Sequence, residues 1–299
     1  MRMILTPIVV FAVAMSACGS DSDSSQADLP SVVVTTSIAG DMVTAALGDL
    51  VGSELTVDVI TPVGADAHEF APSSKQAETM ENANLLVVNG LGYEEGMTGL
   101  IANAVDAGAV AFSLGGTLEP TEGTDPHVWL DPILMSEVFA GLPQAIAGTT
   151  GLSITEVSAN VDAYLTELVE LDASITATFA DTPGAARNLV TSHDALSRFA
   201  DRYGFRIVDT VIPSMSTSAE ASAADLDGVL EAIRTNNVAA IFSETTESDA
   251  LAQAIADELG RTVPVIELYT ESLGEPGSGA DTYIDMMATN AQLIADALD

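Results

Sequence analysis

The chain contains three histidines, and each follows a short segment with the pattern of a buried β-strand. His68 comes after a segment that ends near Ile60, and His127 lies farther beyond one that ends near Phe112. His193 comes two residues after a third such segment, which ends at Thr191. Open α/β sheets bind ligands beyond the carboxyl ends of their strands. The three imidazoles therefore stand where a sheet of this kind would hold a ligand.

An acidic residue, Glu271, occupies the corresponding position after a segment that ends at Leu268. Three imidazoles and a carboxylate suit a divalent first-row metal, because imidazole suits zinc and carboxylate is also acceptable to manganese. A single histidine in a loop usually has no ligand role, but here every histidine of the chain occupies such a loop. We therefore predict a metal site built by His68, His127, His193 and Glu271.

The elements that would position these residues follow from the alternation of β-rich and helical segments, which predicts βαβ units and mainly parallel sheets. The predicted strands are 32–35, 55–60, 85–88, 110–112, 189–191, 207–211, 239–242 and 263–268. The predicted helices lie around 40–47, 75–82, 100–107, 196–203, 224–235, 250–259 and 282–298.

The segment from Ser153 to Ala180 interrupts this alternation, since it has neither glycine nor proline and its apolar residues recur at steps of three and four. This period predicts one amphipathic helix, with Ser153 and Glu156 at capping-box spacing and Pro183-Gly184 beyond its end. At about 1.5 Å per residue the helix would be roughly 40 Å long, enough to join two small domains. A coiled-coil arm is the weaker alternative, because the apolar seam lasts only about four heptads.

We therefore predict an α/β protein of two lobes with mainly parallel sheets, joined by one long rigid helix. His68 and His127 belong to the first lobe, whereas His193 and Glu271 belong to the second. The metal site is accordingly expected in the cleft between the lobes. The expected divisions are a signal peptide over 1–17, a flexible tether over 18–30, lobes over 31–152 and 183–299, and a linking helix over 153–182.

The beginning of the chain has the pattern of a secretion signal. Met1-Arg2-Met3 is short and basic, the residues from Ile4 to Met15 are mostly apolar, and small residues precede Cys18. This resembles a bacterial lipoprotein signal, in which Cys18 is lipidated and becomes the mature N-terminus. An ordinary secretory signal with an incidental cysteine is the alternative. Because Cys18 is the only cysteine, a disulfide framework and a cysteine-based zinc site are excluded.

Composition limits the possible partners. Of 299 residues 47% are apolar, which is enough to build cores, and 44 acids against 8 bases give a formal net charge of −36. Nucleic acids and anionic membrane surfaces need basic footprints and are therefore poor partners. Adaptation to saline surroundings explains this acidity at least as well as a role in the site. Beyond the signal, no stretch reaches the roughly 18 apolar residues of a transmembrane helix.

Four segments resemble, in order, the zinc/manganese-binding solute-binding lipoproteins of bacterial metal ABC transporters. They are ITPVGADAHEFAP from residue 60, DPHVWLDP from 125, LVTSHDALSRFADRYGF from 189 and LYTESLGEPGSGADTYIDMM from 268. The resemblance implies two α/β lobes bridged by a rigid helix, and metal ligands at His68, His127, His193 and Glu271. It also implies an extracytoplasmic, lipid-anchored protein that binds Zn²⁺ or Mn²⁺ as cargo, acts as a monomer without catalysis, and delivers the metal to an ABC transporter permease.

Departures from the resembled family leave the choice of metal open. The family usually has aspartate where Glu271 stands, and the segment from Leu114 to Asp125 lacks the histidine-rich loop of many zinc-specific relatives. Some manganese-specific relatives have an acidic third ligand where this chain has His193. At a given nitrogen and oxygen site zinc binds more tightly than manganese.

Other acids and other functions remain as alternatives. Asp131 and Asp194 could orient an imidazole, although capping or solvent-facing roles are the commoner ones for such acids. Glu244 could line the cleft, and Trp129 is expected to pack rather than bind. The main alternative function is a secreted metal-dependent hydrolase, which would need an open coordination position and a general base. A serine hydrolase is weaker, because no G-x-S-x-G motif is present, and no receptor-binding motif supports an adhesin.

Overall fold

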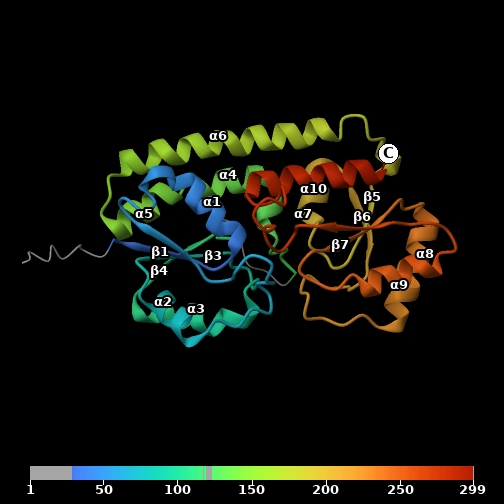
Figure 1. The fold of residues 1–299 in the computed structure, drawn as a ribbon, viewed down its shortest axis with the longest axis horizontal. Helices are drawn as coiled ribbons and strands as arrows, with labels where there is room; N and C mark the ends of the chain where they lie inside the picture. Colours follow the sequence, from blue (N-terminus) through green and yellow to red (C-terminus); the bar gives the residue numbers. More distant parts are fainter. Residues whose placement is uncertain (1–28, 117, 119–122, 299) are drawn as a thin grey trace, which may run out of the picture.

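Two α/β lobes lie side by side beneath one long helix in the computed structural model (Figure 1), which describes residues 29–116, 118 and 123–298. Each lobe contains a four-stranded sheet whose paired strands are parallel. The strand orders are β2-β1-β3-β4 in the first lobe and β6-β5-β7-β8 in the second. The predicted fold class, two parallel-sheet lobes with a long helix, is therefore confirmed.

The elements follow one another in the order that the alternation of patterns predicts, with two additional helices before the long one. The first sheet consists of β1 (Ser31–Val34), β2 (Thr56–Val59), β3 (Leu85–Val88) and β4 (Val110–Ser113). The second consists of β5 (Asn188–Thr191), β6 (Arg206–Thr210), β7 (Ile241–Glu244) and β8 (Val265–Leu268). The helices are α1 (Ser37–Leu47), α2 (Ser74–Glu81), α3 (Thr98–Ala107), α4 (Pro132–Phe139), α5 (Leu142–Thr150), α6 (Ile154–Thr178), α7 (Ser197–Tyr203), α8 (Ala223–Asn236), α9 (Ala250–Glu258) and α10 (Tyr283–Leu298).

The central strands β1, β3, β5 and β7 are buried along almost their whole length because helices cover both faces of each sheet. In β3 the sequence LLVV is buried at every position. The outer strands differ, since one of their edges meets solvent. Val59 of β2 is 43% exposed and Val110 of β4 is 49% exposed.

Each sheet has a point where the strand order reverses. The chain passes from β1 to β2 on one side and then crosses to β3 on the other, and β5, β6 and β7 repeat this arrangement. The carboxyl ends of strands at such switch points form the crevice in which open α/β sheets bind ligands. The two switch points belong to different lobes, so a site shared between the lobes can draw on both.

Helix α6 ties the two lobes together. It packs on α1, α4 and α5 of the first lobe and on α10 (Figure 1). Its buried residues belong to one continuous hydrophobic core that includes Val32 in β1 and Leu189 in β5. The lobes therefore share a core as well as a linker.

The start of α6 differs from the prediction. The capping-box prediction is wrong, because the Ser153 side chain makes no capping hydrogen bond. Ile154, on the predicted apolar face, is 44% exposed.

Sequence analysis missed α4 and α5. Asp131 caps α4 by accepting hydrogen bonds from the backbone N–H groups of Ile133 and Leu134, and Pro132 occupies its first turn. An acid followed by proline is a helix-start signal, but eight or nine residues are too few for the apolar period to be recognised. Strand β7 begins two residues later than predicted, so Glu244 ends the strand rather than following it.

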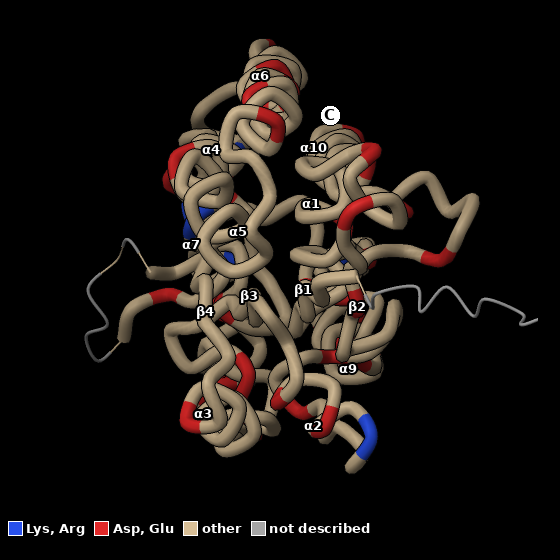
Figure 2. The backbone as a smooth tube through the Cα atoms, turned by 90° about the vertical axis from the view of Figure 1, so that its left-hand side faces the viewer, with Lys and Arg blue, Asp and Glu red and all other residues tan. Residues whose placement is uncertain are grey.

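Acidic residues are spread over many elements, among them α2, α3 and α6 (Figure 2). The negative charge is thus not a property of one element. Within the described part of the chain, no helix combines the length and the apolar character needed to cross a membrane.

Candidate metal centre

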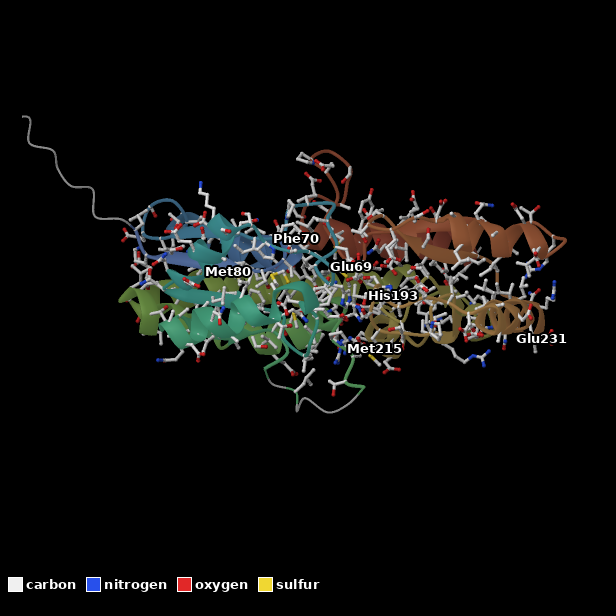
Figure 3. The ribbon with its side chains drawn as sticks, turned by 90° about the horizontal axis from the view of Figure 1, so that it is seen from below. Glu69, Phe70, Met80, His193, Met215 and Glu231 are labelled. Carbon is white, nitrogen blue, oxygen red and sulfur yellow. The ribbon has the colours of Figure 1, made fainter. Side chains whose placement is uncertain are left out.

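The four predicted ligands converge between the lobes although they come from four separate loops. His68 lies beyond β2, His127 precedes a 3₁₀ turn over Val128–Leu130, and His193 and Glu271 follow β5 and β8. Each residue offers one potential ligand atom, and these four atoms all lie within 4.8 Å of one another. None of the four is more than 2% exposed. Figure 3 accordingly shows His193 in the middle of the molecule, where the two lobes meet.

The ligand atoms surround a common point. Glu271 Oε1 lies 3.7 Å from His127 Nε2 and 3.8 Å from His193 Nε2, and Glu271 Oε2 lies 3.8 Å from His68 Nε2. Glu271 Oε1 and both ring nitrogens of His68 are buried without a hydrogen-bond partner. Buried polar atoms in folded proteins are nearly always paired. Unpaired atoms that converge in this way have the arrangement of ligands around a cation.

Two further carboxylates set the orientation of two of the imidazoles. His127 Nδ1 lies 2.7 Å from Asp125 Oδ1, and His193 Nδ1 lies 2.5 Å from Glu244 Oε1. When each Nδ1–H donates to its carboxylate, both Nε2 atoms keep their lone pairs. These Nε2 atoms are 3.3 Å apart. With a proton on one of them the pair shares a hydrogen bond, and once that proton leaves a metal ion can accept both lone pairs.

Local structure explains why these carboxylates are in place. The Asp125 side chain also accepts a hydrogen bond from the backbone N–H of His127, two residues later, so the turn itself positions the acid. The guanidinium group of Arg198 donates to the Asp125 carbonyl oxygen from α7 in the other lobe. Glu244 also accepts a 2.5 Å hydrogen bond from Ser192 Oγ. Each orienting acid is thus held by a partner of its own.

Burial and neighbouring charges separate the pKa values of the site. Burial lowers the pKa of His193. The charge of Glu244 and its hydrogen bond outweigh this effect and raise the pKa to about 9. Burial raises the pKa of Glu271 to about 7. For His68, burial and the two other imidazoles lower the pKa to about 3. In the metal-free protein His193 therefore holds a proton at neutral pH, while His68 is neutral.

Tyr93 restricts how Glu271 can bind. Its hydroxyl donates a 2.7 Å hydrogen bond to Glu271 Oε2, which leaves Oε1 as the unpaired oxygen. A buried acid supports the loop that bears Tyr93, because the Glu94 carboxylate accepts hydrogen bonds from the backbone N–H groups of Asn89 and Gly90. Oε1 is thus the oxygen of Glu271 that has no partner, while Oε2 is shared with the Tyr93 hydroxyl.

Sequence reasoning did not single out Asp125 or Tyr93. The acids it weighed as orienting groups do other work: Asp131 caps α4, and Asp194 accepts a hydrogen bond from Ser197 Oγ. Trp129 packs as predicted, with its ring 5.4 Å from that of His127 and its indole N–H donating to the Thr270 carbonyl oxygen. The predicted lipidation site Cys18 lies outside the described residues.

Comparison with known proteins places this geometry in a family. Residues 32–297 match the family described as zinc-uptake complex component A, periplasmic. The chain belongs to this family. It is 30% identical to the manganese-binding lipoprotein MntA of Halalkalibacterium halodurans, over 97% of this chain and 96% of that protein. It is 26% identical to the iron ABC transporter substrate-binding lipoprotein MtsA of Streptococcus pyogenes, over 100% of this chain and 98% of that protein.

The fold agrees with this assignment. The structure of the periplasmic zinc-binding protein TroA of Treponema pallidum superposes with a TM-score of 0.80 at 28% identity, covering 90% of this chain and 99% of that one. The family consists of solute-binding proteins and not of enzymes, so the hydrolase alternative is set aside. The relatives are named for manganese, iron and zinc, so their names do not identify the cargo of this chain.

Proposed function

We propose that this protein captures a divalent metal ion through His68, His127, His193 and Glu271 and delivers it to the permease of an ABC transporter. The observation that carries the proposal is the set of four buried residues whose ligand atoms lie within 4.8 Å of one another. Among their atoms, Glu271 Oε1 and both ring nitrogens of His68 have no hydrogen-bond partner. The family supports the role as a carrier. A closed set of four protein ligands leaves no position for an activated water, which suits binding rather than hydrolysis.

Among the metals named for the relatives, the donor set favours zinc over manganese. Three imidazole nitrogens and one carboxylate oxygen make a tetrahedral set, which zinc adopts in closed sites. Manganese prefers more oxygen ligands, and the Tyr93 hydrogen bond competes for one of the two Glu271 oxygens. We therefore expect zinc to be the cargo that this site holds more tightly.

Elemental analysis of protein purified without added metal tests the cargo, and competition between zinc and manganese tests the preference. Single alanine substitutions of the three histidines should each reduce zinc affinity severely, because each removes a direct nitrogen ligand. A buried polar residue outside the ligand set provides the control. Thr61→Ala removes such a group after β2 and should leave zinc affinity unchanged. Wild-type affinity in all three histidine variants would overturn the assignment.

The remaining parts of the proposal concern location and organisation. We infer a monomer, extracytoplasmic and anchored by lipid at Cys18, with the tether over 18–30 preceding two lobes over 31–152 and 183–299. Names of relatives as lipoproteins support the anchor. A Cys18→Ser variant should leave the membrane fraction while keeping its metal affinity. Continued fractionation with lipid-anchored proteins would refute the anchor without affecting the metal site.

A further inference from the structure

The buried site needs a path to solvent, and one depression in the described surface reaches it. This depression, of about 330 Å³, is lined by His68 together with residues of both lobes. Glu95 and Pro126 line it from the first lobe, and the Ser214–Ser216 segment lines it from the second. Figure 3 shows Met215, the middle residue of that segment, between the buried His193 and the edge of the molecule. We name this depression the His68 opening.

His68 differs from the other two imidazoles in the way it is held. Asp125 and Glu244 lie 2.7 and 2.5 Å from the Nδ1 atoms of their histidines. The carboxylate nearest to His68 Nδ1 belongs to Glu95, at 3.6 Å, which is beyond hydrogen-bond distance. Both ring nitrogens of His68 consequently have no partner. His68 is therefore the imidazole whose Nδ1 atom has no hydrogen-bond partner on the side of Glu95.

Glu95 has the properties of a first contact for a cation. Its side chain is 43% exposed, whereas that of His68 is 2% exposed. It is the charged residue among those that line the His68 opening. From the other lobe, Ser218 Oγ reaches Glu95 Oε2 at 3.4 Å, and Thr217 Oγ1 donates a 2.5 Å hydrogen bond to Asp66. The segment of the second lobe that borders the opening is thus attached to the first lobe beside Glu95.

We propose that the His68 opening is the route by which the metal ion enters and leaves, and that Glu95 receives the ion and passes it to His68. This inference rests on the proposed metal site. A single negative charge in a confined opening concentrates cations. A group that contacts the ion during passage and not in the bound state lowers the barrier in both directions. Glu95 would therefore change the rates of binding and release together, with little effect on the equilibrium affinity.

Stopped-flow binding of zinc tests this role. Trp129, the only tryptophan, packs on His127, so we expect its fluorescence to follow binding, and a competing chelator gives the dissociation rate. For Glu95→Gln we expect both rate constants to fall about tenfold, the low end of charge-steering effects, with the dissociation constant unchanged within about twofold. Glu69→Gln is the matched control, because it removes the same charge beside His68 at a position that does not line the opening.

A second variant tests the route by size instead of charge. Ser216→Phe narrows the opening and should slow both binding and release while the dissociation constant is preserved. Wild-type rates in both Glu95→Gln and Ser216→Phe would overturn the proposed route. A faster release with unchanged binding in Glu95→Gln would also overturn it, since that result means that Glu95 only orients His68. Absence of zinc binding in the wild-type protein would instead refute the proposed function.

Discussion

Glu244 influences metal binding in two opposing ways, and a Glu244→Gln substitution separates them. The carboxylate orients His193 and adds negative charge near the metal, which favours binding. It also raises the pKa of His193 to about 9, so that a proton must leave before a metal can bind. The amide retains the shape and an oxygen acceptor but removes the charge. Metal affinity in this variant should consequently depend on pH differently from the wild type.

The magnitudes follow from the site. Loss of a carboxylate that orients a ligating histidine typically costs about 10- to 100-fold in metal affinity. Displacing a proton costs about 1.4 kcal/mol for each unit by which the pKa exceeds the pH, or about 3 kcal/mol at pH 7 for a pKa of about 9. Burial without Glu244 lowers the pKa of His193, so the variant avoids this cost. The two effects nearly cancel at pH 7, whereas at pH 9 only the loss remains.

We therefore expect the zinc affinity of Glu244→Gln to approach that of the wild type, within about tenfold, at pH 7 and to be about 10- to 100-fold weaker at pH 9. Chelator-competition titrations at both pH values measure the affinities, and calorimetry in buffers of different ionisation enthalpy counts the protons released. Glu231→Gln, far out in the second lobe (Figure 3), is the control for net charge. A wild-type to variant ratio that is the same at pH 7 and pH 9 would refute this account of Glu244.

Three further predictions concern stability and metal preference. Zinc at 100-fold above its dissociation constant should stabilise the fold by about 2.7 kcal/mol, and a melting curve indifferent to zinc and manganese contradicts a metal site. Glu271→Ala should weaken manganese binding more than zinc binding in competition titrations, because zinc can complete its tetrahedron with water. Glu271→Asp should change the ratio of zinc to manganese affinity, and the control Asp257→Ala should leave that ratio unchanged. Tyr93→Phe frees Glu271 Oε2, so the manganese-to-zinc affinity ratio should rise, and an unchanged ratio argues against control by Tyr93.

The convergence of the four candidate ligands was accessible from sequence because of rarity and position. Three histidines in 299 residues all follow strand patterns, and parallel sheets bring the carboxyl ends of their strands to one edge. The long helix was equally clear, since a 25-residue helix carries several repeats of its apolar face. Helices α4 and α5 carry about two turns each, which gives too few repeats to separate helix from loop.

The metal preference depends on contacts that cross between segments far apart in sequence. Tyr93 and Glu271 are 178 positions apart, yet their 2.7 Å hydrogen bond decides which carboxylate oxygen is free. Neither residue type nor local spacing encodes that contact. It arises because the loop after β3 and the loop after β8 reach the same point from different lobes. The number of oxygens offered to a metal is therefore a property of the fold rather than of the motif.

The acids that orient the histidines were hidden by the composition of the chain. With 44 acidic residues, an aspartate or glutamate beside a histidine carries little information. Asp125 and Asp131 both flank His127, but their geometry differs. Asp125 lies two residues ahead in a turn that aims its carboxylate at Nδ1, whereas Asp131 precedes a proline and is turned toward the first N–H groups of α4. The same residue type thus orients a ligand or caps a helix according to the backbone that carries it, and the backbone conformation decides which.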